Sequence, residues 1–299
     1  MILAGMVARN CFGREVIAYQ EKWASSIREI CLTLLLIRGG LTIKFQGKGL
    51  VIGLVTIIPQ TIEAFSIACV GSVVFDMPFG IAYTLGYTLS CISPSVIVPC
   101  LVSLLERGYG KDKGIPTAII AAGTFDDILT IINNGICASI AFTKIDYITG
   151  EPKESIGMDV LAIFWQIILG MLVGLGTGLL GFFFTKLPST FLYTMHLKFI
   201  WCIIMVFMFP FAADLDGYPH AKFVAALFFG YSSYRVWGED KPSAMLYRFW
   251  FFLQPCLFGT VGAQLIWSQL TGEMIWKSLI IIGVCVSVRC TAAFFATTG

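Results

Sequence analysis

Two adjacent aspartates, Asp126 and Asp127, lie near the middle of a long apolar segment at residues 115–142. A charged side chain in a membrane span costs ~2.5–3.5 kcal/mol on insertion scales, so such residues usually carry function or have partners. Two close carboxylates in a poorly solvated site also resist double ionisation. We therefore interpret the pair as a site that holds either a proton or a bare cation, with the two competing for it.

The surroundings of the pair offer further oxygen ligands. Hard cations such as Na⁺ prefer oxygen donors, and Thr124, Thr130 and exposed main-chain carbonyls can supply them. Because adjacent helical residues point about 100° apart, we expect one aspartate to line an ion path and the other to face a neighbouring helix. The alternative interpretation is a helix cap at a membrane edge, which predicts the pair near the end of a span.

Two more charged residues, Glu63 and Arg289, lie in the middle of other apolar segments. Opposite charges buried in lipid are expected to find each other, so we predict a Glu63–Arg289 ion pair. One alternative is a salt bridge from Arg289 to one of the aspartates. The other is snorkelling of the side chain to the membrane interface.

A third apolar segment, at residues 78–105, carries the interruption Ser93, Pro94 and Pro99. Two prolines so close together, with serines beside them, break an α-helix. A broken span frees backbone groups at membrane depth, which is tolerated where they line a cavity and is typical of transporter sites. A purely structural kink is the alternative.

The composition places these residues in membrane helices. Of the 299 residues, 57% are hydrophobic and 13% are charged, against about 25% charged in soluble domains. The mean hydropathy is +0.84, and a net charge of +2 gives no reason to expect a nucleic-acid partner. A span needs about 20 apolar residues. We predict an all-α polytopic membrane protein with an N-terminal helix remnant and about nine transmembrane helices, near residues 25–46, 49–75, 78–105, 115–142, 158–185, 193–213, 220–236, 246–268 and 274–298.

Small residues are expected to serve helix packing. The ten cysteines include no C-x-x-C pair and mostly lie in apolar runs, so we interpret them as small apolar packing residues. Gly170, Gly174 and Gly178 have the spacing of a close helix–helix contact, either within the protomer or between protomers.

The segments 93–99, 108–116, 121–129 and 254–263 together resemble the animal NHA branch of the monovalent cation/proton antiporters, the sodium/hydrogen exchanger 9B-like proteins related to bacterial NhaA and NapA. The resemblance implies an NhaA-like inverted-repeat fold with a dimerisation domain and a mobile core domain. It implies a homodimer in a lipid bilayer that exchanges Na⁺ or Li⁺ for H⁺ by alternating access, with no cofactor.

The resemblance also assigns roles to particular residues. Asp126 and Asp127 match the ion-binding pair, with Asp127 as the direct ligand, and Thr124 stands where a serine is expected. Arg289 matches a basic position that is Lys in the electrogenic bacterial members, and Glu63 matches its acidic partner. Because Arg keeps its proton where Lys can release one, the pair favours an electroneutral exchange of one proton per cation.

Measured against that family, residues 1–299 are expected to form an exchanger transmembrane domain that is incomplete at both ends, without the second broken helix and the following span. A cation channel or ion sensor using the same acids, or an inactive regulatory short isoform, are the alternative functions. An enzyme is not expected, because no nucleophile–base set is apparent. The plasma membrane is the favoured location, with endosomal or mitochondrial membranes as alternatives.

Overall fold

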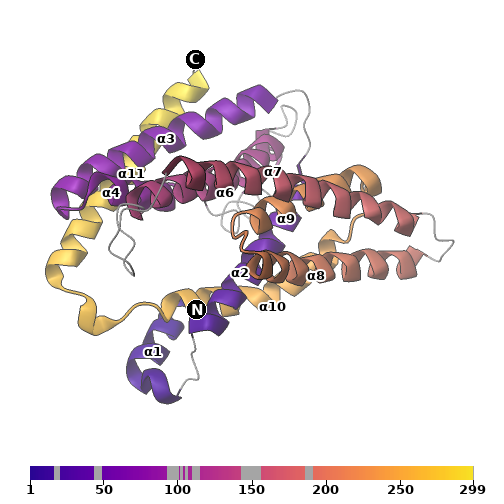
Figure 1. Cartoon of the computed structure of the whole chain (residues 1–299), viewed down its shortest axis with the longest axis horizontal. Coiled ribbons are helices and arrows are strands. Elements are labelled where there is room, and N and C mark those ends of the chain that lie inside the picture. The colour runs from indigo at the N-terminus through magenta and orange to yellow at the C-terminus, as the bar shows by residue number, and fades with distance from the viewer. Residues whose placement is uncertain are drawn as a thin grey trace. The chain divides into compact units, whose positions relative to one another are not determined.

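The computed structural model describes residues 1–16, 21–43, 49–92, 101, 104, 107–109, 115–142, 156–185 and 191–298. Within this part of the chain all regular elements are helical, as the composition predicts (Figure 1). The α-helices are α1 (Ile2–Val16), α2 (Glu21–Gly40), α3 (Gly49–Val74), α4 (Phe79–Leu89), α6 (Ile115–Phe142), α7 (Ile156–Leu180), α8 (Phe191–Asp216), α9 (Ala221–Trp237), α10 (Ser243–Gly262) and α11 (Gly272–Thr298). Two 3₁₀ turns follow α7 and α10, at Gly181–Thr185 and Trp267–Gln269.

The chain divides into two compact units. Unit 1 comprises Met1–Thr42 and Leu169–Gly272, and unit 2 comprises Ile43–Ile168 and Glu273–Gly299. In unit 1, α2 packs on α8, α9 and α10, and α1 packs on α10. In unit 2, α3, α4 and α6 pack on one another. The prediction of one exchanger domain over residues 1–299 stays a prediction.

Unit 1 contains a cluster of buried apolar side chains on α2, α8, α9 and α10, with Leu34, Ile37, Val206 and Phe229 among its most buried members. Close backbone contacts tighten the same helices. A methyl group added at Gly40 of α2 would lie 2.3 Å from the carbonyl oxygen of Leu227 on α9. Only glycine allows the two helices to approach this closely, so α2 and α9 form a tightly packed pair.

The regularly spaced glycines of α7 contact helix α9 of the same chain. Methyl groups at Gly170 and Gly174 would lie 2.5 Å and 2.3 Å from the carbonyl oxygens of Ala221 and Ala225 on α9. Gly178 faces the hydroxyl of Ser232 on the same helix. The three glycines therefore follow one side of α9, which is the first of the two predicted alternatives.

Unit 2 holds α4 firmly against α3. A methyl group at Gly86 of α4 would lie 2.3 Å from the carbonyl oxygen of Ala64 on α3. Helix α4 ends at Leu89, where the Ser90 N–H donates to the carbonyl of Gly86. The residues that follow, Cys91 and Ile92, are not helical. The expected span 78–105 is therefore not helical throughout, and the predicted interruption at Ser93, Pro94 and Pro99 lies outside the described residues.

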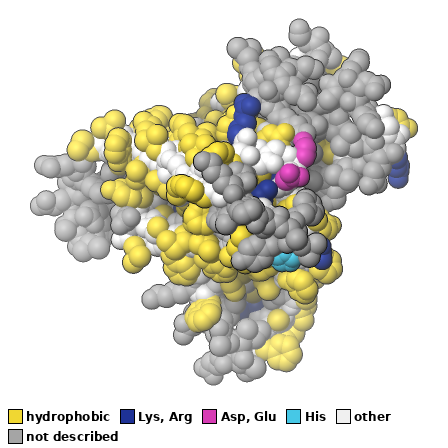
Figure 2. Space-filling view, turned by 90° about the vertical axis from the view of Figure 1, so that its right-hand side faces the viewer, with side chains coloured by type: hydrophobic (Ala, Val, Ile, Leu, Met, Phe, Trp, Pro, Cys, Tyr) yellow, Lys and Arg dark blue, Asp and Glu magenta, His cyan; other side chains and the backbone are white. Residues whose placement is uncertain are grey.

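Four of the described helices are long and apolar enough to cross a membrane, over Thr56–Val74, Val160–Phe183, Thr194–Leu215 and Gly272–Phe295. The predicted number of about nine spans is not confirmed by this measure and stays a prediction. On the face drawn in Figure 2, most described side chains are hydrophobic. An exposed apolar surface of this kind is what lipid covers in a membrane protein.

Candidate ion-binding site

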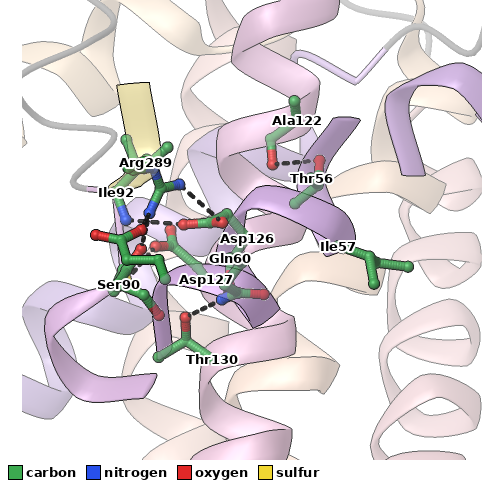
Figure 3. Close-up of polar contacts among 12 residues, drawn as sticks. Thr56, Ile57, Gln60, Ser90, Ile92, Ala122, Asp126, Asp127, Thr130 and Arg289 are labelled. Carbon is green, nitrogen blue, oxygen red and sulfur yellow. Dashed lines mark hydrogen bonds and ion pairs between the residues drawn. The ribbon is translucent and has the colours of Figure 1, made fainter. Parts of the chain in front are cut away.

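Asp126 and Asp127 lie in the interior of α6, away from the two helix ends where the cap alternative places them. Their surroundings differ, as the 100° offset predicts. Asp126 is 1% exposed, whereas Asp127 is only half-buried. Figure 3 shows both aspartates beside the guanidinium of Arg289 and the backbone of Ile92. The two carboxylates thus have different surroundings.

Both oxygens of Asp126 have donors. Its Oδ1 lies 3.3 Å from Nη2 of Arg289 on α11, and its Oδ2 accepts a 2.8 Å hydrogen bond from the backbone N–H of Ile92 (Figure 3). The carboxylate is therefore tied both to α11 and to the segment that follows α4. This contact is the alternative predicted for Arg289, a salt bridge to one of the aspartates.

The predicted contact between Glu63 and Arg289 is also present. Glu63, on α3, is 1% exposed, and its Oε2 lies 2.6 Å from Nη1 of Arg289. The same nitrogen donates to the carbonyl of Ser90 at the end of α4. Glu63 Oε1 accepts a 2.7 Å hydrogen bond from the thiol of Cys285. Arg289, whose side chain is 20% exposed, thus contacts two buried carboxylates and is the cation of this cluster among the described residues.

Asp127 has a weaker donor. Its Oδ1 accepts a hydrogen bond from the thiol of Cys91, with Sγ and Oδ1 3.1 Å apart. A thiol is a weak hydrogen-bond donor compared with a guanidinium or a backbone amide. Among the described residues, Asp127 is therefore the carboxylate of this site that is least committed to protein donors.

The interpretation of all ten cysteines as apolar packing residues is wrong for two of them. The thiols of Cys91 and Cys285 point at carboxylate oxygens of Asp127 and Glu63. The sequence pattern did not reveal this, because Cys285 lies in an apolar run and nothing beside Cys91 in the sequence indicates a carboxylate partner. The contacts arise from packing between helices that are distant in sequence.

Gln60 is a member of the site that the sequence reasoning missed. It is 1% exposed, and its Nε2 donates to the carbonyl of Asp126 at 3.1 Å and to the hydroxyl of Thr130 at 2.6 Å (Figure 3). Thr130, expected as an oxygen ligand, thus accepts a hydrogen bond from α3. A signal was available, because Gln60 precedes Glu63 by three residues and such residues share one face of a helix.

Some predicted site residues cannot be placed. Ser93, Pro94 and Pro99 lie outside the described residues, and so does the side chain of Thr124, although its backbone belongs to α6. The described site therefore consists of four charged residues and the groups that hydrogen-bond to them. Its members are Gln60 and Glu63 on α3, Ser90, Cys91 and Ile92 after α4, Asp126, Asp127 and Thr130 on α6, and Cys285 and Arg289 on α11.

The model of the family described as "Sodium/hydrogen exchanger, transmembrane" matches residues 1–299. The chain belongs to the sodium/hydrogen exchanger family, a family of transporters, and the family prediction is confirmed. The chain is 29% identical to sodium/hydrogen exchanger 9B2 of Homo sapiens over 302 residues, which cover 98% of this chain and 54% of the relative. It is 29% identical to exchanger 9B1 of Homo sapiens over 296 residues, covering 97% of this chain and 55% of the relative.

A third relative, exchanger 9B2 of Bison bison bison, is 31% identical over 297 residues, with 97% of this chain and 53% of the relative covered. The chain spans about half the length of the curated relatives it matches. Among solved structures, the sodium proton antiporter MjNhaP1 from Methanocaldococcus jannaschii matches with a TM-score of 0.69 at 15% identity, covering 100% of this chain and 71% of that one. This likeness shows a shared fold.

Proposed function

We propose that this chain takes part in the exchange of Na⁺ or Li⁺ for H⁺ across a membrane by alternating access, with cation and proton competing for Asp126 and Asp127. Membership of the sodium/hydrogen exchanger family and the antiporter fold support the transport class. The arrangement of charges on α3, α6 and α11 supports the placement of the site.

The charge balance of this site carries the proposal. Glu63, Asp126 and Asp127 are three carboxylates, and Arg289 is the cation that contacts two of them. With all four ionised, the cluster has a formal charge of −2. An unbalanced buried charge is costly, so the cluster should bind a compensating positive charge. A proton and an alkali-metal ion both meet this need, and they exclude each other at one carboxylate.

The contacts suggest separate roles for the two aspartates. Asp127 has a weak thiol donor and is half-buried, so it is the carboxylate best able to take an incoming cation directly. Asp126 has donors on both oxygens, so it supports the site mainly through its charge. Thr124 remains a proposed oxygen ligand on the same helix.

The Glu63–Arg289 pair has a consequence for the number of protons exchanged per cation. Arg289 stays protonated at any physiological pH, and Glu63 lies 2.6 Å from it. Arg289 therefore does not carry a proton in the proposed cycle. One proton would then move for each cation. Reconstituted liposomes test this directly, because an electroneutral exchanger generates no current and a net current would reject the stoichiometry.

The exchange itself is tested by Na⁺-dependent pH change in vesicles. Parent protein should show it, and Asp127→Asn and Asp126→Asn should each abolish or strongly reduce it. Asp76→Asn is a matched control, because Asp76 follows α3 with a φ of 52° that asparagine tolerates. Intact exchange in both site variants would contradict the assignment, and an uncoupled Na⁺ current would favour the channel alternative.

The assembly and location remain proposals as well. We propose a homodimer in the plasma membrane, with endosomal or mitochondrial membranes as the alternatives. Cross-linking in native membranes tests the first proposal, and fractionation of organelles tests the second.

A further inference from the structure

Three consecutive residues at the end of α4 each hold a different member of the charged cluster. The carbonyl of Ser90 accepts from Arg289, the thiol of Cys91 donates to Asp127, and the N–H of Ile92 donates to Asp126. Two of these contacts come from the backbone. The contact of Cys91 is made by a side chain, so a substitution can remove it without disturbing the other two.

The backbone that carries Cys91 is well anchored. Ser90 is fully buried, its N–H donates to Gly86, and its hydroxyl donates to the carbonyl of Tyr87 at 3.1 Å. Gly86 in turn packs against the backbone of Ala64 on α3. Cys91 therefore projects from a fixed helix end and can fix the orientation of a flexible partner.

The contact occupies one oxygen of Asp127, and no described residue hydrogen-bonds to the other. Oδ1 accepts from Cys91, whereas Oδ2 has no hydrogen bond to another described residue. A carboxylate with one oxygen held loses less rotamer freedom when an ion binds to the other, and preorganisation of this kind raises affinity. A weak donor also suits the role, because it orients the carboxylate without neutralising its charge.

We propose that Cys91 is a positioning residue for Asp127, which holds Oδ1 so that Oδ2 faces the transported cation. The proposal rests on the proposed function, because it assumes that Asp127 binds the cation. It adds a residue to the ion site that acts through Asp127 and does not itself coordinate Na⁺.

Binding can be measured without transport. In detergent, a cation that binds the folded protein raises its melting temperature, and the concentration dependence gives the half-saturating concentration. Na⁺ should be compared with choline at equal ionic strength. We expect Cys91→Ala to raise the half-saturating Na⁺ concentration about threefold to tenfold, the range for the loss of one weak hydrogen bond. Cys91→Ser retains a hydrogen-bond donor, so its half-saturating Na⁺ concentration should lie closer to the parent value.

Cys69→Ala is the matched control, because Cys69 is an exposed cysteine on α3 in the same unit. It should leave Na⁺ binding unchanged. The exchange assay gives a second readout, in which Cys91→Ala should raise KM for Na⁺ and leave kcat close to the parent value. A merely structural role would instead lower the amount of folded protein and affect the alanine and serine variants alike.

The outcomes separate the two proposals. If parent protein is stabilised by Na⁺ and Cys91→Ala behaves like the parent, the positioning role is overturned and the exchange proposal stands. If the parent binds Na⁺ with the expected Cys91 dependence but shows no exchange, the exchange proposal fails and the positioning role stands. If Na⁺ does not stabilise the parent more than choline does, the positioning role is overturned together with the ion site.

Discussion

The two units of this chain bury charged side chains of different sign and with different partners. In unit 1 two lysines are 5% exposed. Lys198 on α8 donates to the carbonyl of Asp240 at 2.8 Å, and Lys222 at the start of α9 contacts Glu29 at 2.8 Å and Asp214 at 3.0 Å. Those partners keep 24% and 57% of their side chains exposed. In unit 2, Glu63 and Asp126 are 1% exposed, and they lie within helices away from the ends.

This difference agrees with the proposed ion site in unit 2. Lys222 at the start of α9 has two carboxylate partners that both keep contact with solvent, so its desolvation cost is moderate. Charges inside helices, with three carboxylates against one guanidinium, are retained at a cost that packing does not explain. The buried acidic cluster of the proposed ion site therefore lies in unit 2, and the buried charges of unit 1 have partners outside that cluster.

The largest effect is expected from breaking the cluster in unit 2. Arg289→Met leaves Glu63 and Asp126 buried without their cation, and removal of one partner from a buried pair typically costs about 3–5 kcal/mol. We expect the free energy of unfolding in detergent to fall by that order and exchange to be lost. The double variant Glu63→Gln/Arg289→Met should recover part of the stability, and a fully additive loss would show that the two residues are not coupled.

A smaller effect is expected at the ion pair of unit 1. Lys222→Met removes a hydrogen-bonded charge from Glu29 and Asp214, and we expect a loss of about 1.5–3 kcal/mol because both carboxylates retain contact with solvent. The Na⁺ concentration that gives half of the maximal rise in melting temperature should stay at the parent value. A shift in Na⁺ affinity would mean that unit 1 is more than a support.

The same substitution in both units sharpens the comparison. Gly174→Ala and Gly86→Ala each place a methyl group 2.3 Å from a carbonyl oxygen on a neighbouring helix, and such overpacking costs about 1–3 kcal/mol. Gly86→Ala should also weaken Na⁺ binding, because α4 carries Cys91 and Ile92, whereas Gly174→Ala should not. Gly176→Ala is the control for both, since no described atom outside its own stretch of helix lies within 4 Å of the added methyl. Equal effects on Na⁺ binding at positions 86 and 174 would remove the distinction between the units.

The smallest effect is expected from an exposed ion pair in unit 2. Lys277 lies 2.7 Å from Glu273 one helical turn away near the start of α11, and the Glu273 side chain is mostly exposed. Exposed pairs of this kind contribute little. Lys277→Met should leave the melting temperature and Na⁺ binding unchanged within error, so any clear shift would contradict the view that, within unit 2, buried charges contribute and exposed ones do not.

Much of this site was visible in the sequence. Asp126, Asp127, Glu63 and Arg289 stand out because charges inside apolar segments are rare, and the family follows from local motifs around the aspartates. The helical character of the apolar segments is equally local, because a chain in lipid must satisfy its backbone groups within each segment. The number of spans and the roles of the site residues stay predictions.

The tertiary structure determined which hydrogen-bond and ion-pair partner each site residue has. Sequence left open whether Arg289 pairs with Glu63 or with an aspartate, and the fold gives it both, although Glu63 is 226 residues away. Sequence alone predicted packing roles for Cys91 and Cys285 and was silent on Gln60, yet all three hydrogen-bond within the acidic site. Residue type and spacing reveal which groups are costly to bury, whereas the packing of α3, α4, α6 and α11 determines which donor reaches which oxygen.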